Sequence, residues 1–216
     1  MNVLARWSAA LLGLLTVFLA PLAAYAQPIE QTVEEHRDDR GEIDRFGSAF
    51  VHRASGYVYP AKLGELPARK TITFGRADAE VFYTLHGSSG GDAWISLYVY
   101  PARTSLADEK RGVEAIIVQN YGAKATARPA IIGAPPAGVV EGWFRASIKG
   151  ADVFTGARIA EVNGWNIKVR VSIPVSGGQA ALERASRAVA EIMMTPPALR
   201  PANVPSPSQP AIATTR

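Results

Sequence analysis

The segment Gly87-Ser88-Ser89-Gly90-Gly91 matches the G-x-S-x-G pattern in which a serine attacks a carbonyl carbon. In a hydrolase of this type the serine lies in a sharp turn between a strand and a helix, and a histidine serves as its general base. His86 is adjacent, but the alternating apolar residues at 93–100 predict that a strand, not a helix, follows the glycines. The segment therefore predicts a flexible hairpin connection. A hydrolase using Ser89 and His86 remains the alternative.

Other catalytic and cofactor sites have weaker support. The three histidines, His36, His52 and His86, are isolated in the sequence, and there is no cysteine, so zinc is not expected. The acidic cluster at 34–39 includes Arg37, which favours a solvated charged surface over a metal site. Neither G-x-x-x-x-G-K-[ST] nor G-x-G-x-x-G occurs. We therefore expect no metal, no cofactor and no catalytic set.

An aromatic strip is predicted on one face of the strand at 93–100. Alternation places Trp94, Tyr98 and Tyr100 opposite the aliphatic residues of that strand. An exposed strip of rings can bind an apolar or sugar-like ligand or a partner protein. The alternative is that a helix, or the segment around Tyr57, covers the strip, because soluble monomers seldom expose so much apolar surface.

A small basic patch is predicted on the outer face of the hairpin at 153–174. In this interpretation Lys168 and Arg170 lie beside Arg158 and Arg145. Solvated sheet charges explain the same residues, since edge-strand lysines discourage aggregation. The strip and the patch together give the predicted ligand- or partner-binding residues, which are Trp94, Tyr98, Tyr100, Arg145, Lys168 and Arg170.

The same hairpin is the element around which the fold is expected to form. Its second arm alternates strictly between apolar and polar residues, and Asn163-Gly164 can supply the positive φ values of a tight turn. A two-residue loop would place Arg158 opposite Val169 on the apolar face. We therefore predict a bulged three-residue loop that pairs Ile159 with Ile167 and turns Arg158 outward.

The remaining pattern predicts short strands and two amphipathic helices. The strands are expected at 57–60, 70–75, 80–86, 93–100 and 139–149, and the helices at 106–121 and 179–194. Strands joined by hairpins, with only two helices, predict an α+β fold. We expect an antiparallel β-sheet of about six to seven strands with two α-helices packed on it.

The two ends of the chain are expected to lie outside this domain. Residues 1–26 resemble a signal peptide, with Arg6, an apolar run and the small-x-small site Ala24-Tyr25-Ala26. The domain organisation expected is a signal peptide at 1–26, a charged flexible leader at 27–55, a single α+β domain at 56–195 and a disordered proline-rich tail at 196–216.

Export would place the protein in a periplasm or outside the cell, with no stable membrane anchor after signal cleavage. The formal net charge is only +4 over 216 residues, and no run of lysine and arginine gathers on one face. Nucleic acid is therefore not an expected partner. An envelope protein or a small ligand is expected instead.

Several strand signatures also resemble those of known proteins. They are Tyr59-Pro60, Leu63-Gly64, Leu66, Arg69, Tyr83, the strand at 95–101 and the strand at 168–174. These residues are similar to a group of uncharacterised exported bacterial proteins, and the element order resembles the PsbP family of extrinsic photosystem II proteins. The resemblance implies a non-enzymatic periplasmic accessory or binding domain. The role of PsbP at the manganese cluster is not implied, because no matching residue is present. An envelope structural or interaction protein is a further alternative.

Overall fold

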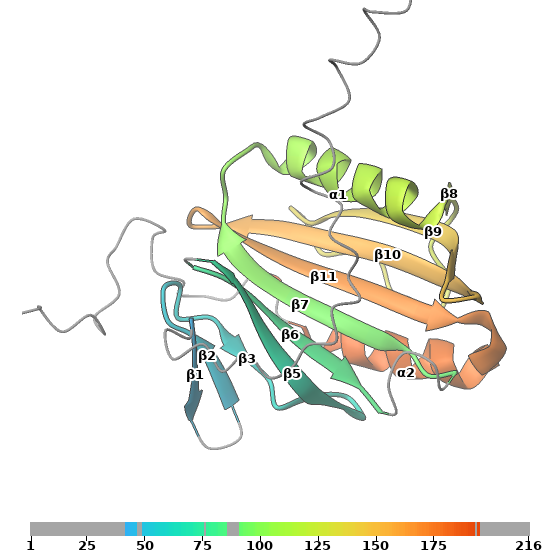
Figure 1. Ribbon diagram of the computed structural model, residues 1–216, viewed down its shortest axis with the longest axis horizontal. Coiled ribbons are helices and arrows are strands. Elements are labelled where there is room, and N and C mark those ends of the chain that lie inside the picture. Colours follow the sequence, from blue (N-terminus) through green and yellow to red (C-terminus); the bar gives the residue numbers. More distant parts are fainter. Residues whose placement is uncertain (1–41, 47–48, 76, 86–90, 193, 195–216) are drawn as a thin grey trace, which may run out of the picture. The chain divides into compact units, whose positions relative to one another are not determined.

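The computed structural model describes residues 42–46, 49–75, 77–85, 91–192 and 194. The predicted signal peptide, the first part of the leader and the proline-rich tail lie outside these residues. The elements are β1 (Ile43–Phe46), β2 (Ala49–His52), β3 (Val58–Tyr59), β4 (Lys62–Leu63), β5 (Leu66–Gly75), β6 (Asp78–Thr84), β7 (Trp94–Pro101), α1 (Leu106–Tyr121), β8 (Lys124–Ala125), β9 (Val140–Ile148), β10 (Ala151–Val162), β11 (Trp165–Pro174), a 3₁₀ turn (Val175–Gly177) and α2 (Gly178–Ala190) (Figure 1).

The described strands form two antiparallel sheets. The larger has eight strands in the order β4-β5-β6-β7-β11-β10-β9-β8, and the smaller has the order β1-β2-β3. The chain runs through β4 to β7, crosses by α1 to the far edge, and returns through β9 and β10 to place β11 beside β7. The predicted α+β class and antiparallel pairing are confirmed. The number of strands is higher than predicted, because short strands form at both edges and in the leader.

The part of the leader that the structure describes is folded, so the predicted start of order near Gly56 is wrong. β1 and β2 pair over their whole length, and Ile43 and Phe50 pack against the main core. Two of the charges that suggested a mobile segment are paired, with Arg53 Nη2 and Asp44 Oδ1 2.6 Å apart. High charge density therefore hid two short strands.

The central hairpin forms with a different register from the one predicted. Asn163 and Gly164 have φ values of 52° and 79°, as a two-residue type I′ turn requires. Val162 pairs with Trp165, and Arg158 pairs with Val169. The predicted three-residue loop is therefore wrong. That loop was predicted because it keeps the charge of Arg158 off the apolar face. In the structure a carboxylate on a neighbouring strand pairs with this charge, so the apolar face can accommodate it.

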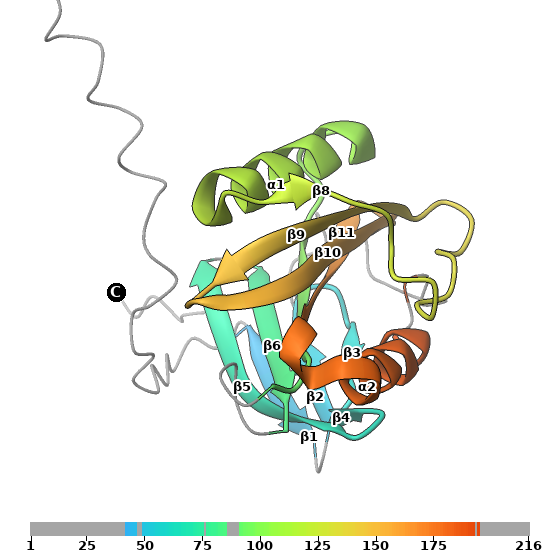
Figure 2. The same cartoon turned by 90° about the vertical axis from the view of Figure 1, so that its right-hand side faces the viewer.

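The two faces of the eight-stranded sheet carry different helices (Figure 2). We call them the α1 face and the α2 face. On the α1 face, Val113 and Ile117 of α1 are buried with Phe144 and Ile159 of β9 and β10. Ser105 caps α1 by accepting a hydrogen bond from the Asp108 amide at 3.2 Å, so both predicted ends of this helix are confirmed.

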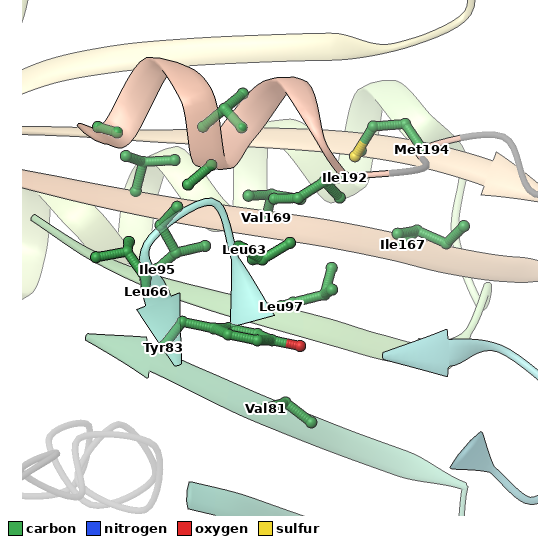
Figure 3. Packing of buried hydrophobic residues seen from close by; sticks show 14 of the residues in the cluster. Leu63, Leu66, Val81, Tyr83, Ile95, Leu97, Ile167, Val169, Ile192 and Met194 are labelled. Carbon is green, nitrogen blue, oxygen red and sulfur yellow. The ribbon is translucent and has the colours of Figure 1, made fainter. Parts of the chain in front are cut away.

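The main core lies on the α2 face. Aliphatic residues of β6, β7 and β11 meet Ile192 and Met194 around the ring of Tyr83 (Figure 3). Small residues of α2 and the aromatic rings that follow β2 belong to the same cluster. The cluster includes Val81, Tyr83, Ile95, Leu97, Ile167, Val169, Ala185, Tyr57 and Tyr59. α2 ends at Ala190, earlier than the predicted Met194, but Ile192 and Met194 remain buried in the same core.

Gly156 allows β9 and β10 to pack closely at Trp143. A Cβ atom at residue 156 would lie 2.5 Å from ring atoms of Trp143, which is 5 % exposed. We expect Gly156→Ala to force the indole out of place and to lower the free energy of unfolding by about 1–3 kcal/mol. Urea denaturation measures this loss, and Gly133→Ala is the matched control because a Cβ there meets no atom within 4 Å. Equal stability of the two variants would contradict the expectation.

Candidate ligand-binding sites

Three of the predicted site residues come together on the α1 face. The register places Lys168 of β11 opposite Tyr98 of β7. The Lys168 ammonium nitrogen lies 4.3 Å from the centroid of the Tyr98 ring and 5.0 Å from that of Tyr100. Both distances allow cation–π attraction. Lys168 therefore rests on the aromatic strip and does not project into solvent as a free charge.

Carboxylates surround this lysine. Coulombic attraction from Glu109, Asp78 and Glu80 favours the charged ammonium, but burial is the larger effect and lowers the pKa of Lys168. Burial likewise raises the pKa of Glu80, although Ser96 and Tyr98 hydrogen-bond to it. The Tyr100 hydroxyl donates to Glu109 at 2.5 Å. The charged and hydroxyl groups of this site thus contact one another and form an ionic network.

The aromatic strip is partly covered by its surroundings. Phe74 of β5 stacks on Tyr98 with a centroid distance of 6.3 Å, while Trp94 packs against the core under α1. Tyr57 lies in the core on the α2 face, so the alternative that its segment covers the strip is wrong. Phe74 is 58 % exposed and presents the open ring of this region.

A shallow recess opens beside Tyr100, at the end of the strip. It has a volume of about 260 Å³ and is lined by Asp78, Tyr100, Pro101, Arg103, Thr104 and Glu109. Of the strip, only Tyr100 lines this recess, whereas Trp94 and Tyr98 do not. Burial raises the pKa of Asp78, and Lys168 and Arg103 oppose that shift.

The predicted basic patch does not form. Arg170 stays on the α1 face, 4.8 Å from the centroid of the Tyr121 ring. Arg145 lies on the opposite face, 4.3 Å from the centroid of the Phe154 ring and paired with Asp152. Arg158 also lies on the α2 face, because the register differs from the predicted one. The sheet therefore separates the arginines that the sequence pattern had grouped.

The α2 face contains a second cavity, which we call the Arg158 cavity. Its volume is about 350 Å³, and it lies between α2, the loop before β9 and the central hairpin. The lining residues are Ile131, Gly133, Ala134, Pro136, Arg158, Val169, Ser186, Val189, Ala190, Ile192 and Met194. Ser186 of α2 donates to the Ile131 carbonyl at 2.8 Å, which fixes the loop against the helix.

Arg158 is the charged residue of this lining, and it is only 6 % exposed. Its Nε donates to Glu141 Oε2 at 3.1 Å, and its Nη2 donates to the Gly133 carbonyl. Glu141 also accepts hydrogen bonds from Arg128 and, at 3.1 Å, from the indole Nε1 of Trp143. One carboxylate thus pairs with two guanidinium groups, and the three groups together carry a net positive charge beside the apolar cavity.

The sequence contained a signal for this cavity. Arg158 falls on the apolar side of the hairpin when the Asn163-Gly164 turn takes its two-residue form. When alternation places one charged residue among apolar ones, either the predicted register is wrong or the charge is buried with a partner. The partner, Glu141, is a strand away, and the loop at 131–136 and α2 complete the site only in the fold.

Nothing in the described residues forms a metal site, since they hold no group of three or more potential ligands. Ser89 and His86 lie outside the described residues. On either side of them, β6 and β7 pair antiparallel, so the segment connects two strands, as predicted. A nucleophile elbow needs a helix directly after the serine, and β7 stands there instead.

Comparisons with family models, with curated proteins and with solved structures each found no match to this chain. The resemblance to exported bacterial proteins and to the PsbP family therefore stays a prediction. In the part of the chain that the structure describes, no helix is long and apolar enough to span a membrane.

Proposed function

We propose that this chain is an exported, non-catalytic binding domain whose ligand occupies the Arg158 cavity. Ligand pockets are mostly apolar, with a few polar groups that orient the ligand, and they start at about 300 Å³. The Arg158 cavity has this composition and about this size. The observation that carries the proposal is the buried guanidinium in an otherwise apolar wall. Export is supported by the signal-like composition of residues 1–26.

The Lys168 network supports a binding function less well. Its lysine already contacts two rings, and its three carboxylates are offset by three cations, Lys168, Arg103 and Arg170, which accounts for its charges without a ligand. Phe74 is an exposed aromatic residue beside this network, and an envelope protein could contact its ring. An envelope interaction through Phe74 is thus the second candidate function, and it uses the opposite face of the sheet.

The cavity can be tested by filling it. Ala190, at the end of α2, and Ala180, in the first turn of the same helix, are both exposed, but only Ala190 lines the cavity. We expect the neutral fluorescent probe N-phenyl-1-naphthylamine to bind the wild type saturably. Ala190→Phe should weaken this binding about tenfold or more, a change of about 1.4 kcal/mol, because the new ring takes the space of the probe.

Ala180→Phe is the matched control and should bind the probe as the wild type does. Circular dichroism and a thermal melt establish that both variants are folded. Probe binding that is unchanged in Ala190→Phe, or lost equally in both variants, would show that the cavity is not the binding site.

A further inference from the structure

We infer that the ligand of the Arg158 cavity is an amphipathic anion, with one carboxylate or similar headgroup and an apolar body. This inference rests on the proposed function and specifies the ligand class of the same site. It depends on where the positive charge lies, on which donors are left for a ligand, and on what forms the rest of the wall.

The charge balance of the cluster favours an anion. Arg158 and Arg128 share the single carboxylate of Glu141, and the side chains of Arg158 and Glu141 are 7 % and 17 % exposed. The two arginines of α2 have partners of their own, since Arg184 pairs with Asp92 and Arg187 pairs with Glu65. A partly buried positive charge is costly unless an anion balances it, so a ligand carboxylate would be stabilised here.

Arg158 also has donors for that carboxylate. A guanidinium carries five N–H bonds in a planar fork that matches a carboxylate. The hydrogen bonds of Arg158 use Nε toward Glu141 and Nη2 toward Gly133. Nη1 makes no hydrogen bond to the residues that the structure describes, and the residue lines the cavity. The two existing bonds hold the plane of the guanidinium fixed, so it is preorganised for a headgroup.

The opposite part of the wall favours an apolar body. Val169 and Ile192 contribute to the main core and also line the cavity, and Met194 follows them. Ser186 is the hydroxyl residue of the lining, and its Oγ already donates to the Ile131 carbonyl. A ligand with polar groups along its whole length would leave those groups unpaired, whereas an alkyl or aryl chain would not.

The test compares two probes of equal chain length by titration calorimetry on the mature full chain. Decanoate carries a carboxylate and decanol does not, and both are used below the concentrations at which they aggregate. We expect decanoate to bind at least about tenfold more tightly than decanol. Arg158→Met should abolish this preference, so that decanoate and decanol bind this variant with equal affinity. Arg158→Lys should retain part of the preference, because it keeps the charge but not the fork.

Arg145→Met is the matched control, because Arg145 lies on the same face of the sheet and does not line the cavity. It should keep the full preference for decanoate. Equal affinities of decanoate and decanol for the wild type would overturn the anion inference and leave the proposed cavity standing. An unchanged preference in Arg158→Met would also overturn it. Failure of both probes to bind would overturn the proposed function itself.

Discussion

Glu141→Gln should lower the free energy of unfolding by about 3–5 kcal/mol, since it removes the carboxylate of a largely buried ionic cluster. Arg158 would keep its charge at 6 % exposure with no carboxylate beside it. Arg128, whose Nε is buried without a hydrogen-bond partner in the described residues, would lose the same carboxylate. The cost arises from a charge left unbalanced in the interior rather than from the loss of one hydrogen bond.

Guanidinium chloride denaturation of the wild type and of Glu141→Gln measures this effect. Asp152→Asn is the matched control, because it breaks the exposed ion pair with Arg145, in which the two side chains are 58 % and 36 % exposed. Exposed pairs contribute about 0–1 kcal/mol. A second comparison uses the double variant Glu141→Gln with Arg158→Met, in which the uncompensated guanidinium is absent. It should regain part of the lost stability. Equal losses in Glu141→Gln and Asp152→Asn would show that the cluster is solvated.

Local patterns predicted the elements of this fold correctly wherever a single segment contains the necessary information. α1 carries its own N-cap at Ser105 and its own left-handed C-cap at Gly122, so its ends follow from nearby residues. The position of the turn at Asn163-Gly164 is likewise local, because both residues tolerate the positive φ that the turn needs, but its two-residue form was not predicted. The antiparallel class followed from hairpin connections.

The register and the Arg158 cavity could not be predicted in the same way. Arg158 was turned outward because the sequence shows its charge but does not show that Glu141, on β9, lies opposite it. The cavity needs three segments, around Ile131, Val169 and Val189, which only the packing of α2 brings together. The Lys168 network was partly predicted, because alternation along β7 and β11 places Lys168 on the same face of the sheet as Tyr98 and Tyr100. The acidic residues that match it come from β6 and α1.

The buried histidine should make stability depend on pH. His52 is fully buried, with Nδ1 2.7 Å from the Ser55 hydroxyl oxygen and its ring 5.3 Å from that of Trp165 in an edge-on arrangement. Burial lowers the pKa of His52 from 6.5 to about 4, with a smaller opposing effect from the backbone of Ala77. A proton therefore binds the unfolded chain more readily than the folded one.

The sign follows from this difference in proton affinity. The stabilising contribution of neutral His52 is fully present above pH 6.5 and is lost as the pH falls from about 6.5 to about 4. The loss amounts to about 3 kcal/mol, with no further loss from this group at lower pH. The buried acids Asp78 and Glu80 act in the opposite direction, because burial raises the pKa of each. A wild-type titration alone would therefore mix the two effects.

His52→Gln separates them, because glutamine does not titrate and can still hydrogen-bond to Ser55. We expect urea denaturation at pH 7 and at pH 4 to show that the stability difference between wild type and variant shrinks by about 3 kcal/mol at the lower pH. The acids and the other histidines are common to both proteins, so their contributions cancel in this difference. A difference that stays constant with pH would mean that the pKa of His52 is the same in the folded and the unfolded chain. An anionic partner would then have to offset the burial of His52 beside Trp165.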